Sequence, residues 1–168
     1  MRALLFGNAG SGKTFYAEHL ARRHGLAHLD LDSIVWEPGQ VGGLRPMPRV
    51  AEDLTSFLDA HSRWVIEGCT SALVALAAAD CTELVFMNPG EAVCLANCRA
   101  RPWEPQKYAS KPAQDDKLAL LLEWVHGYYV REDEWSLARH RQLFRGHDGA
   151  KREVSGQLSL HEVGGHAR

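Results

Sequence analysis

The segment Gly7-Asn8-Ala9-Gly10-Ser11-Gly12-Lys13-Thr14 constrains the fold of this chain more than any other feature. It matches the pattern G-x-x-x-x-G-K-[ST] of a phosphate-binding loop, in which glycines let successive backbone N–H groups point at phosphate oxygens. The apolar run at residues 2–6 predicts a buried parallel strand before the loop. The amphipathic run at residues 13–24 predicts a helix after it, whose positive end adds to the cradle. The alternative is a glycine-rich turn without a ligand, which gives no packing reason for the lysine.

Two side chains of this loop have defined tasks in the pattern. The Lys13 ammonium can reach the β- and γ-phosphates, and the Thr14 hydroxyl can ligate Mg²⁺. The sequence therefore predicts that residues 7–14 bind a nucleoside triphosphate.

Composition limits the class of protein. The 168 residues fit one domain that needs neither disulfides nor a structural metal. The net charge of -2 shows no basic surplus for nucleic acid or an anionic membrane. No apolar stretch approaches the ~20 residues needed to span a bilayer, and residues 2–6 are too short for a signal-peptide core. We therefore expect a cytoplasmic protein, with no membrane and no nucleic acid as partner, and with free thiols at its cysteines.

Short apolar runs alternate with amphipathic runs, which predicts βα units and a mostly parallel sheet covered on both faces. The expected strands are residues 2–6, 26–29, 63–66, 83–87 and 151–155. The expected helices are residues 13–24, a helix around 50–58, and residues 71–79, 91–101, 115–130 and 136–144. Residues 37–48 and 102–112 are rich in proline and predict loops, and residues 157–168 remain unassigned.

Carboxylates follow two of the expected strands, where ligands of parallel sheets bind. Asp30 and Asp32 would project the same way from an extended chain. One could hold Mg²⁺, and the other could orient an acceptor hydroxyl and take its proton. The alternative is a solvated loop in which Asp32 caps a helix. Glu67, at the end of the third strand, could be a second carboxylate for Mg²⁺ or could simply be solvated.

These segments together resemble the adenylate kinase-like small-molecule kinases. The resemblance lies in residues 2–14, Leu29-Asp30-Leu31-Asp32 and Trp64-Val65-Ile66-Glu67-Gly68. The Asp-x-Asp is similar to shikimate kinases. Residues 32–39 and 64–68 look more like the DNA topology modulation proteins, a branch of the same group that usually has aspartate where Glu67 stands. The resemblance covers roughly residues 1–155.

The resemblance implies an α/β fold, a P-loop three-layer α/β/α sandwich with a five-stranded parallel sheet in the order 2-3-1-4-5. It implies one kinase-like domain over residues 1–155, a tail at 156–168, and a mobile lid at about 101–113. It also implies ATP and Mg²⁺ as cofactors. Arg99 and Arg101 match the arginines that begin the lid and close over phosphates. Lys107 and Lys111 are either available to phosphate or solvated.

The leading hypothesis is an ATP-dependent phosphotransferase, a kinase whose acceptor is a nucleoside, a nucleotide or a small metabolite. The expected catalytic residues are Lys13, Asp32, Arg99 and Arg101, the metal ligands are Thr14, Asp30 and Glu67, and the acceptor contacts are Asp32 and Trp36. The arginine signatures that bind shikimate or AMP in related kinases are missing, so the acceptor stays open. The alternative is a nucleotide-gated regulatory or binding P-loop NTPase without a small-molecule acceptor. A closing lid favours the kinase, whereas an exposed apolar patch favours the regulator.

Overall fold

The structure is a computed structural model that describes residues 1–37, 43–105 and 108–156. Its strands are β1 (Arg2–Gly7), β2 (Ala27–Asp30), β3 (Trp64–Gly68), β4 (Glu83–Met87) and β5 (Lys151–Val154). All neighbouring strands pair in parallel, in the order β2-β3-β1-β4-β5. The predicted fold class and strand order are therefore confirmed.

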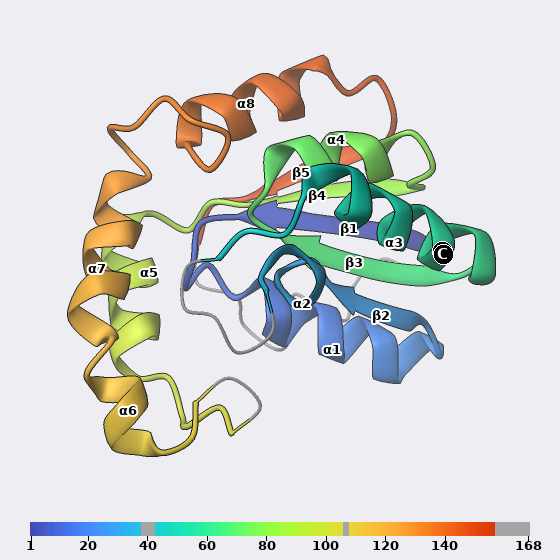
Figure 1. The fold of residues 1–168 in the computed structure, drawn as a ribbon. Helices are drawn as coiled ribbons and strands as arrows, with labels where there is room; N and C mark the ends of the chain where they lie inside the picture. Colours follow the sequence, from blue (N-terminus) through green and yellow to red (C-terminus); the bar gives the residue numbers. More distant parts are fainter. Residues whose placement is uncertain (38–42, 106–107, 157–168) are drawn as a thin grey trace.

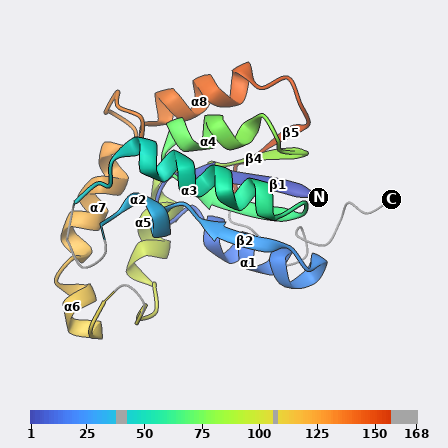
Figure 2. The ribbon, with the colours of Figure 1, turned by 45° about the vertical axis from the view of Figure 1, so that its right-hand side comes forward.

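The helices form layers on both faces of this sheet. They are α1 (Lys13–His24), α2 (Asp32–Val35), α3 (Met47–Ala60), α4 (Ser71–Ala78), α5 (Glu91–Arg99), α6 (Lys111–Asp115), α7 (Leu118–Gly127) and α8 (Leu137–Gly146). Figure 1 shows α1 below the sheet, α3, α4 and α8 above it, and α5, α6 and α7 beyond the ends of the strands. The turned view in Figure 2 shows the same layers.

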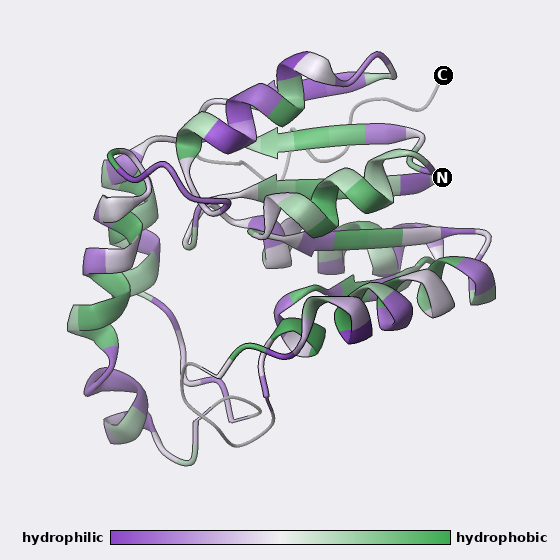
Figure 3. Ribbon diagram, turned by 45° about the horizontal axis from the view of Figure 1, so that its top comes forward, coloured by the Kyte–Doolittle hydropathy of each residue, from purple (hydrophilic) through white to green (hydrophobic). Residues whose placement is uncertain are grey.

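Alternating side chains of the central strands build a core on each face of the sheet. Leu4 and Phe6 of β1 belong to the cluster that packs against α3, α4 and α8. Ala3 and Leu5 point the other way, into the cluster that includes α1. Successive residues of a strand face opposite sides, so a strand covered on both faces must be apolar throughout. Figure 3 shows the hydrophobic strands at the centre of the molecule.

The helix predicted at residues 115–130 is wrong in its boundaries. The structure has α6 at Lys111–Asp115 and a separate α7 at Leu118–Gly127. Pro112 stands in the first turn of α6, where its missing N–H has no helical partner to lose, and the Ser110 side chain caps this turn. The prediction failed because proline was taken to exclude a helix, although proline is tolerated in the first helical turn. A similar error placed residues 47 and 48 in a loop, although Pro48 lies in the first turn of α3.

Other expectations about the chain can be stated briefly. No helix in the described ranges is long and apolar enough to cross a membrane. The four cysteines are free thiols, as predicted, and Cys94 and Cys98 are buried on one face of α5. The second strand begins and ends one residue later than predicted, and α5 ends at Arg99 rather than at residue 101.

A buried histidine ties α7 and α8 to the end of β3. His140 in α8 is fully buried, and its ring stands nearly perpendicular to the rings of Phe6 and Phe86. Its Nε2 donates to the carbonyl oxygen of Cys69 at 2.8 Å, so its Nδ1 accepts the Tyr128 hydroxyl at 2.9 Å. Burial lowers the pKa of His140 to about 4, because the charged imidazolium has no solvent there. The imidazole is therefore a neutral bridge between three elements.

We expect the stability difference between the wild-type protein and His140→Gln to shrink by about 3 kcal/mol between pH 6.5 and pH 4. The folded pKa lies below the unfolded one, so the unfolded chain binds the additional proton in this window. The contribution of the neutral imidazole to the free energy of unfolding is complete above the pKa of the unfolded chain. It is lost as pH falls through the pKa of the folded protein. Urea unfolding at a series of pH values measures it, with the exposed His61→Gln as control. A difference that does not change with pH would contradict the assignment.

Candidate functional site

Residues 7–14 form a loop between β1 and α1, at the carboxyl edge of the sheet. Gly10 has φ 75° and Gly12 has φ 90°, a left-handed conformation that side chains rarely adopt. A Cβ atom at Gly10 would lie 2.3 Å from the carbonyl oxygen of Cys94, so α5 also excludes any larger residue. Gly12 caps α1 without a side-chain hydrogen bond, which leaves the first-turn N–H groups to other acceptors. This geometry fits a bound phosphate.

Two asparagine side chains connect the phosphate-binding loop to neighbouring helices. The Asn8 side chain donates to the carbonyl oxygen of Val125 in α7 at 3.0 Å. The Asn97 side chain in α5 donates to the carbonyl oxygen of Gly10 at 2.8 Å. The buried Oδ1 of Asn8 and Oγ of Ser11 have no partner among the described residues. Protein contacts thus fix the shape of the loop, and two of its polar side-chain atoms are left for a ligand to contact.

Lys13 lies inside the site rather than in solvent. Only 7% of Lys13 is exposed, and its Nζ donates to the carbonyl oxygen of Asn8 at 2.8 Å. Burial by itself lowers the pKa of this ammonium group, but the acidic groups of Cys69, Glu67 and Asp32 raise it above its ordinary value. The side chain is therefore a fixed positive charge at the loop.

Thr14 and Glu67 are directly connected across the site. The Thr14 hydroxyl donates to Oε1 of Glu67 at 2.7 Å, and Glu67 is only 2% exposed. Burial and the neighbouring Asp30 carboxylate raise the pKa of Glu67 to about 7, while Lys13 and the Thr14 hydrogen bond lower it. Glu67 is thus placed next to the hydroxyl that the loop pattern assigns to Mg²⁺, and not in solvent.

The predicted extended arrangement of Asp30 and Asp32 is wrong. Leu31 between them is helical, with φ -60°, and Asp32 is the first residue of α2. The Oδ1 atom of Asp30 accepts the backbone N–H of Asp32 at 2.9 Å, which satisfies a donor at the start of the short helix. The backbone turn therefore decides where these side chains lie. Both still act electrostatically on Glu67, so the acidic residues after β2 and β3 do gather in one place.

The remaining predicted site residues lie just after α2 and around the predicted lid. Trp36 is half-buried, pairs through its backbone with Leu44 and packs against the larger core cluster. Arg101 pairs with Glu104 at 3.2 Å, and Lys111 pairs with Asp115. Arg99 is exposed at the end of α5. Lys107 lies outside the described residues.

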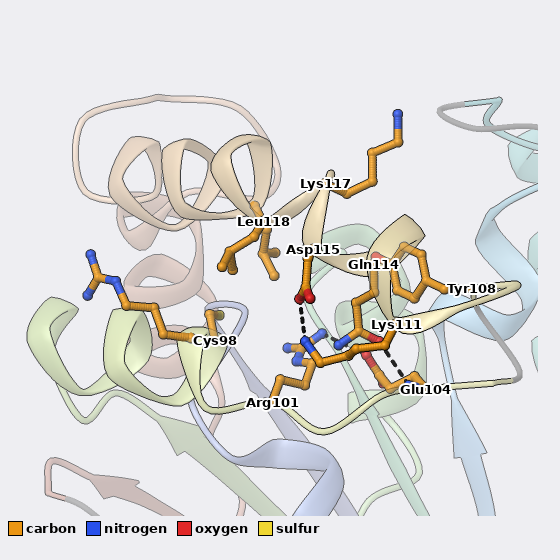
Figure 4. A pocket seen from close by; sticks show the side chains of 11 residues that line it. Cys98, Arg101, Glu104, Tyr108, Lys111, Gln114, Asp115, Lys117 and Leu118 are labelled. Atoms are coloured by element: carbon orange, nitrogen blue, oxygen red, sulfur yellow. Dashed lines mark hydrogen bonds and ion pairs between the residues drawn. The ribbon is translucent and has the colours of Figure 1, made fainter.

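Residues of the predicted lid line a small cavity together with the neighbouring helices. It is lined from α5, α6 and the start of α7 by Arg99, Arg101, Glu104, Tyr108, Lys111, Gln114, Asp115 and Lys117, together with Cys98, Leu118 and Leu121. Figure 4 shows Arg101 and Lys111 side by side, facing Glu104 and Asp115. The buried Gln114 bonds the N–H of Glu104 and the carbonyl oxygen of Pro102, both at 2.9 Å. Arg101 and Lys111 are thus paired with acidic residues of the same segment.

Several residues of the site were missed by sequence reasoning. The Cys69 thiol lies beside Lys13, and burial raises the pKa of this thiol to about 11, so it stays protonated. Its position directly after Glu67-Gly68 was an available signal, because ligands gather at strand ends. Asn97 and His140 gave no such signal, since their partners are 87 and 71 residues away in the sequence.

The donor atoms fit Mg²⁺ better than a softer metal. Thr14, Glu67, Asp30 and Asp32 offer only oxygen atoms, which are the ligands of magnesium. Within the described ranges, no three His, Cys, Asp or Glu side chains are arranged to hold a metal by themselves. Mg²⁺ in phosphate-transfer sites usually takes one or two carboxylates and completes its shell with phosphate oxygens and water. The residues present therefore suit a magnesium ion that arrives with a nucleotide.

We expect the free energy of unfolding of Glu67→Gln, relative to that of the wild-type protein, to rise by up to about 3 kcal/mol as pH increases from 4.5 to 7. Its folded pKa lies above its unfolded value, so the folded protein holds a proton in this window that the unfolded chain releases. The cost of the ionised carboxylate is absent below the unfolded pKa and complete above the folded one. Urea unfolding at pH 5 and pH 8 measures the change, with Glu18→Gln on the surface of α1 as control. Equal differences at both pH values would contradict this environment.

Comparison with known proteins adds information on the fold alone. No family model matches the chain, and no curated protein matches it. The shikimate kinase from Acinetobacter baumannii in complex with shikimate is 17% identical, with a TM-score of 0.51 over 94% of this chain and 84% of that chain. A sugar kinase from Janibacter sp. HTCC2649, an unliganded structure, is 13% identical, with a TM-score of 0.55 over 96% and 88%. The shikimate kinase from Aquifex aeolicus is 20% identical, with a TM-score of 0.54 over 97% and 90%.

These identities of 13% to 20% are too low to carry an activity or a substrate from one protein to another. The coverage is nevertheless nearly complete on both sides of each comparison, and the strand order agrees with the order expected for this fold. The chain therefore has the fold of the P-loop small-molecule kinases.

Proposed function

We propose that this chain is a phosphotransferase that uses ATP and Mg²⁺ and acts on a small-molecule acceptor. One observation carries the proposal: a preformed phosphate-binding loop lies directly beside carboxylates. The Lys13 ammonium is buried over the loop at 2.8 Å from the carbonyl oxygen of Asn8, and the Thr14 hydroxyl is bonded to Glu67 at 2.7 Å. The kinase-like fold supports the same conclusion.

Each residue has a role in this proposal. Backbone amides of residues 7–14 and the Lys13 ammonium bind the phosphates, and Thr14, Asp30 and Glu67 hold the magnesium ion. Bound Mg²⁺ would offset the charge of the phosphate oxygens. Asp32 orients the acceptor hydroxyl and takes its proton, and Trp36 packs against the acceptor. Phosphoryl transfer depends mainly on positioning and electrostatics, which these groups supply.

The lid is part of the same proposal, with residues 1–155 as one domain and 156–168 as a tail. Arg101 must leave Glu104 before it can offset charge on the transferring group, because the two now form an ion pair. Arg99 is exposed and needs no such exchange. A lid that closes over the phosphates excludes water and favours transfer to an acceptor over hydrolysis.

The test is ATP consumption with and without a pool of nucleosides, nucleotides and small metabolites, after calorimetric titration with Mg·ATP. Stimulation by a compound of the pool supports the kinase. A slow rate that no compound changes, with Mg·ATP bound, supports the nucleotide-gated regulator instead. Well-folded protein that does not bind Mg·ATP would rule out both activities and leave the fold unaffected.

A further inference from the structure

Opposite charges lie on opposite sides of the phosphate-binding loop. The strand β1, which leads into the loop, lies between β3 and β4. The segments after β2 and β3 bring Asp30, Asp32 and Glu67 to the site. The segments after β4 bring the cations of the predicted lid, such as Arg101 and Lys111. The triphosphate would therefore lie between an acidic side and a basic side, with the carboxylate that receives the acceptor proton on the acidic side.

The acidic side has few cations, and protein groups already engage them. Arg45 and Arg49 are the only arginine or lysine residues between Asp30 and Arg63, and residues 69–82 after β3 contain none. Nη1 of Arg45 donates to the carbonyl oxygen of Ile34 at 2.7 Å and pairs with Asp53 at 2.8 Å. Arg49 is exposed on α3 and pairs with Glu52 at 3.5 Å. Arg45 therefore offers no unengaged charge to an acceptor, and the charge of Arg49 is exposed and screened by solvent.

A third arginine approaches from the loop between α7 and α8. Arg131 lies over the ring of Trp124, 3.7 Å from its centroid, and donates to the carbonyl oxygen of Trp124 at 2.7 Å. The Trp124 ring lies 5.8 Å from the ring of Trp135, whose Nε1 donates to the Thr70 hydroxyl just after β3 at 3.2 Å. The Nε atom of Arg131 makes no hydrogen bond among the described residues and lies 3.8 Å from Oδ1 of Asp133. The loop beside the end of β3 therefore contributes aromatic rings and a guanidinium whose charge is paired with Asp133.

We propose that the acceptor is an uncharged hydroxyl compound, and that the site discriminates against acceptors bearing a phosphate or carboxylate group. This inference rests on the proposed function. An anionic acceptor would have to enter beside Asp30, Asp32 and the γ-phosphate. Among the described residues after β2 and β3, no buried cation is left without a protein partner to offset its charge, and like charges at short range repel. An uncharged acceptor meets no such repulsion, and its apolar face can pack on the half-buried Trp36.

The transfer step is balanced without any further reactant. The acceptor oxygen forms a bond to the γ-phosphorus, and the bond from that phosphorus to the β–γ bridging oxygen breaks. ADP leaves with the electron pair of the broken bond. The hydroxyl proton passes to the Asp32 carboxylate. An acceptor whose phosphate group is itself the nucleophile would have to bring charged oxygens against this carboxylate, and this electrostatic repulsion adds to the discrimination.

The first experiment uses matched pairs of acceptors that differ only in charge. Nucleosides are compared with their monophosphates, and aldoses with the corresponding aldonates and sugar phosphates, in a coupled assay of ADP formation. We expect at least one uncharged member to stimulate ADP formation with a kcat/KM at least tenfold above that of its charged partner. A charged member that is the better acceptor would overturn the inference and leave the proposed kinase activity standing.

A second measurement decides the case in which no compound of the panel is used. Diadenosine pentaphosphate carries a second nucleoside and further phosphates from the ATP position toward the acceptor side. We expect its Mg²⁺ complex to bind within tenfold of Mg·ATP in calorimetry, because the acidic side gains nothing from the additional phosphates. Binding more than tenfold tighter would overturn the inference. Failure of Mg·ATP itself to bind would instead refute the proposed function, so the two failures are distinct.

Discussion

Replacing Lys13 with alanine is expected to lower ATP turnover about 100- to 1,000-fold while the protein stays folded, the loss typical of removing one preorganised charged donor. The ammonium is buried beside the loop and cannot be replaced by a solvent cation in a fixed position. The fold is expected to survive because the loss is confined to one hydrogen bond to a loop carbonyl and to the charge interactions with Glu67 and Asp32. Steady-state ADP formation with Mg·ATP measures the loss, and the melting temperature without ligand checks the fold.

The matched control removes a positive charge from the same helix. Arg22 lies near the end of α1, is mostly exposed and pairs with Glu18 one turn earlier. Arg22→Ala should leave turnover unchanged, since exposed ion pairs of this kind contribute little. Normal turnover in a well-folded Lys13→Ala protein would remove the residue from the proposed mechanism.

Gly10→Ala is expected to destabilise the protein by about 4 kcal/mol, which combines the left-handed backbone with an overpacked contact. The added Cβ would lie 2.3 Å from the carbonyl oxygen of Cys94 and 2.7 Å from the Cys98 sulfur, and the first of these is backbone that cannot rotate away. For a domain of this size the melting temperature should fall by about 8–16 °C. Thermal unfolding followed by circular dichroism measures the effect.

Gly25→Ala separates the two causes of that loss. Gly25 also has a left-handed backbone, with φ 61°, but no atom lies within 4 Å of the position of its Cβ. Its substitution should cost only about 1 kcal/mol. Equal losses for the two variants would mean that α5 does not press against the phosphate-binding loop as described.

The sequence was most informative where structure is decided by neighbours along the chain. Residues 3–6 are uniformly apolar because β1 is covered on both faces, and the glycines of the loop mark positive φ angles. The periodicity of residues 13–24 likewise gave α1 with its exact bounds. The strand order was expected only through resemblance to a family, since nothing local says which strands will be neighbours.

Prediction failed where two local rules competed. Proline both ends a helix and begins one, and at Pro112 the second role prevailed because Ser110 supplies the cap. An Asp-x-Asp sequence suits an extended strand and a helix start equally well. At Asp30 and Asp32 the helix start prevailed, because the first carboxylate satisfies the N–H of the second.

The supports of the candidate site could not be predicted for a different reason. Asn97, Tyr128 and His140 act through partners on other elements, and their sequence neighbourhoods resemble those of ordinary helix residues. Nothing in the local sequence distinguishes the buried His140 from the other histidines of the chain. Only the packing of α5, α7 and α8 around the end of the sheet gives these side chains their role.

The asparagine contacts behind the phosphate-binding loop have a mechanical consequence. Asn8 is fastened to α7 and Gly10 to α5, and these are the helices between which the predicted lid is suspended. A tilt of either helix is therefore expected to displace the phosphate-binding loop through these hydrogen bonds. The position of the predicted lid and the shape of the phosphate-binding loop are therefore expected to change together.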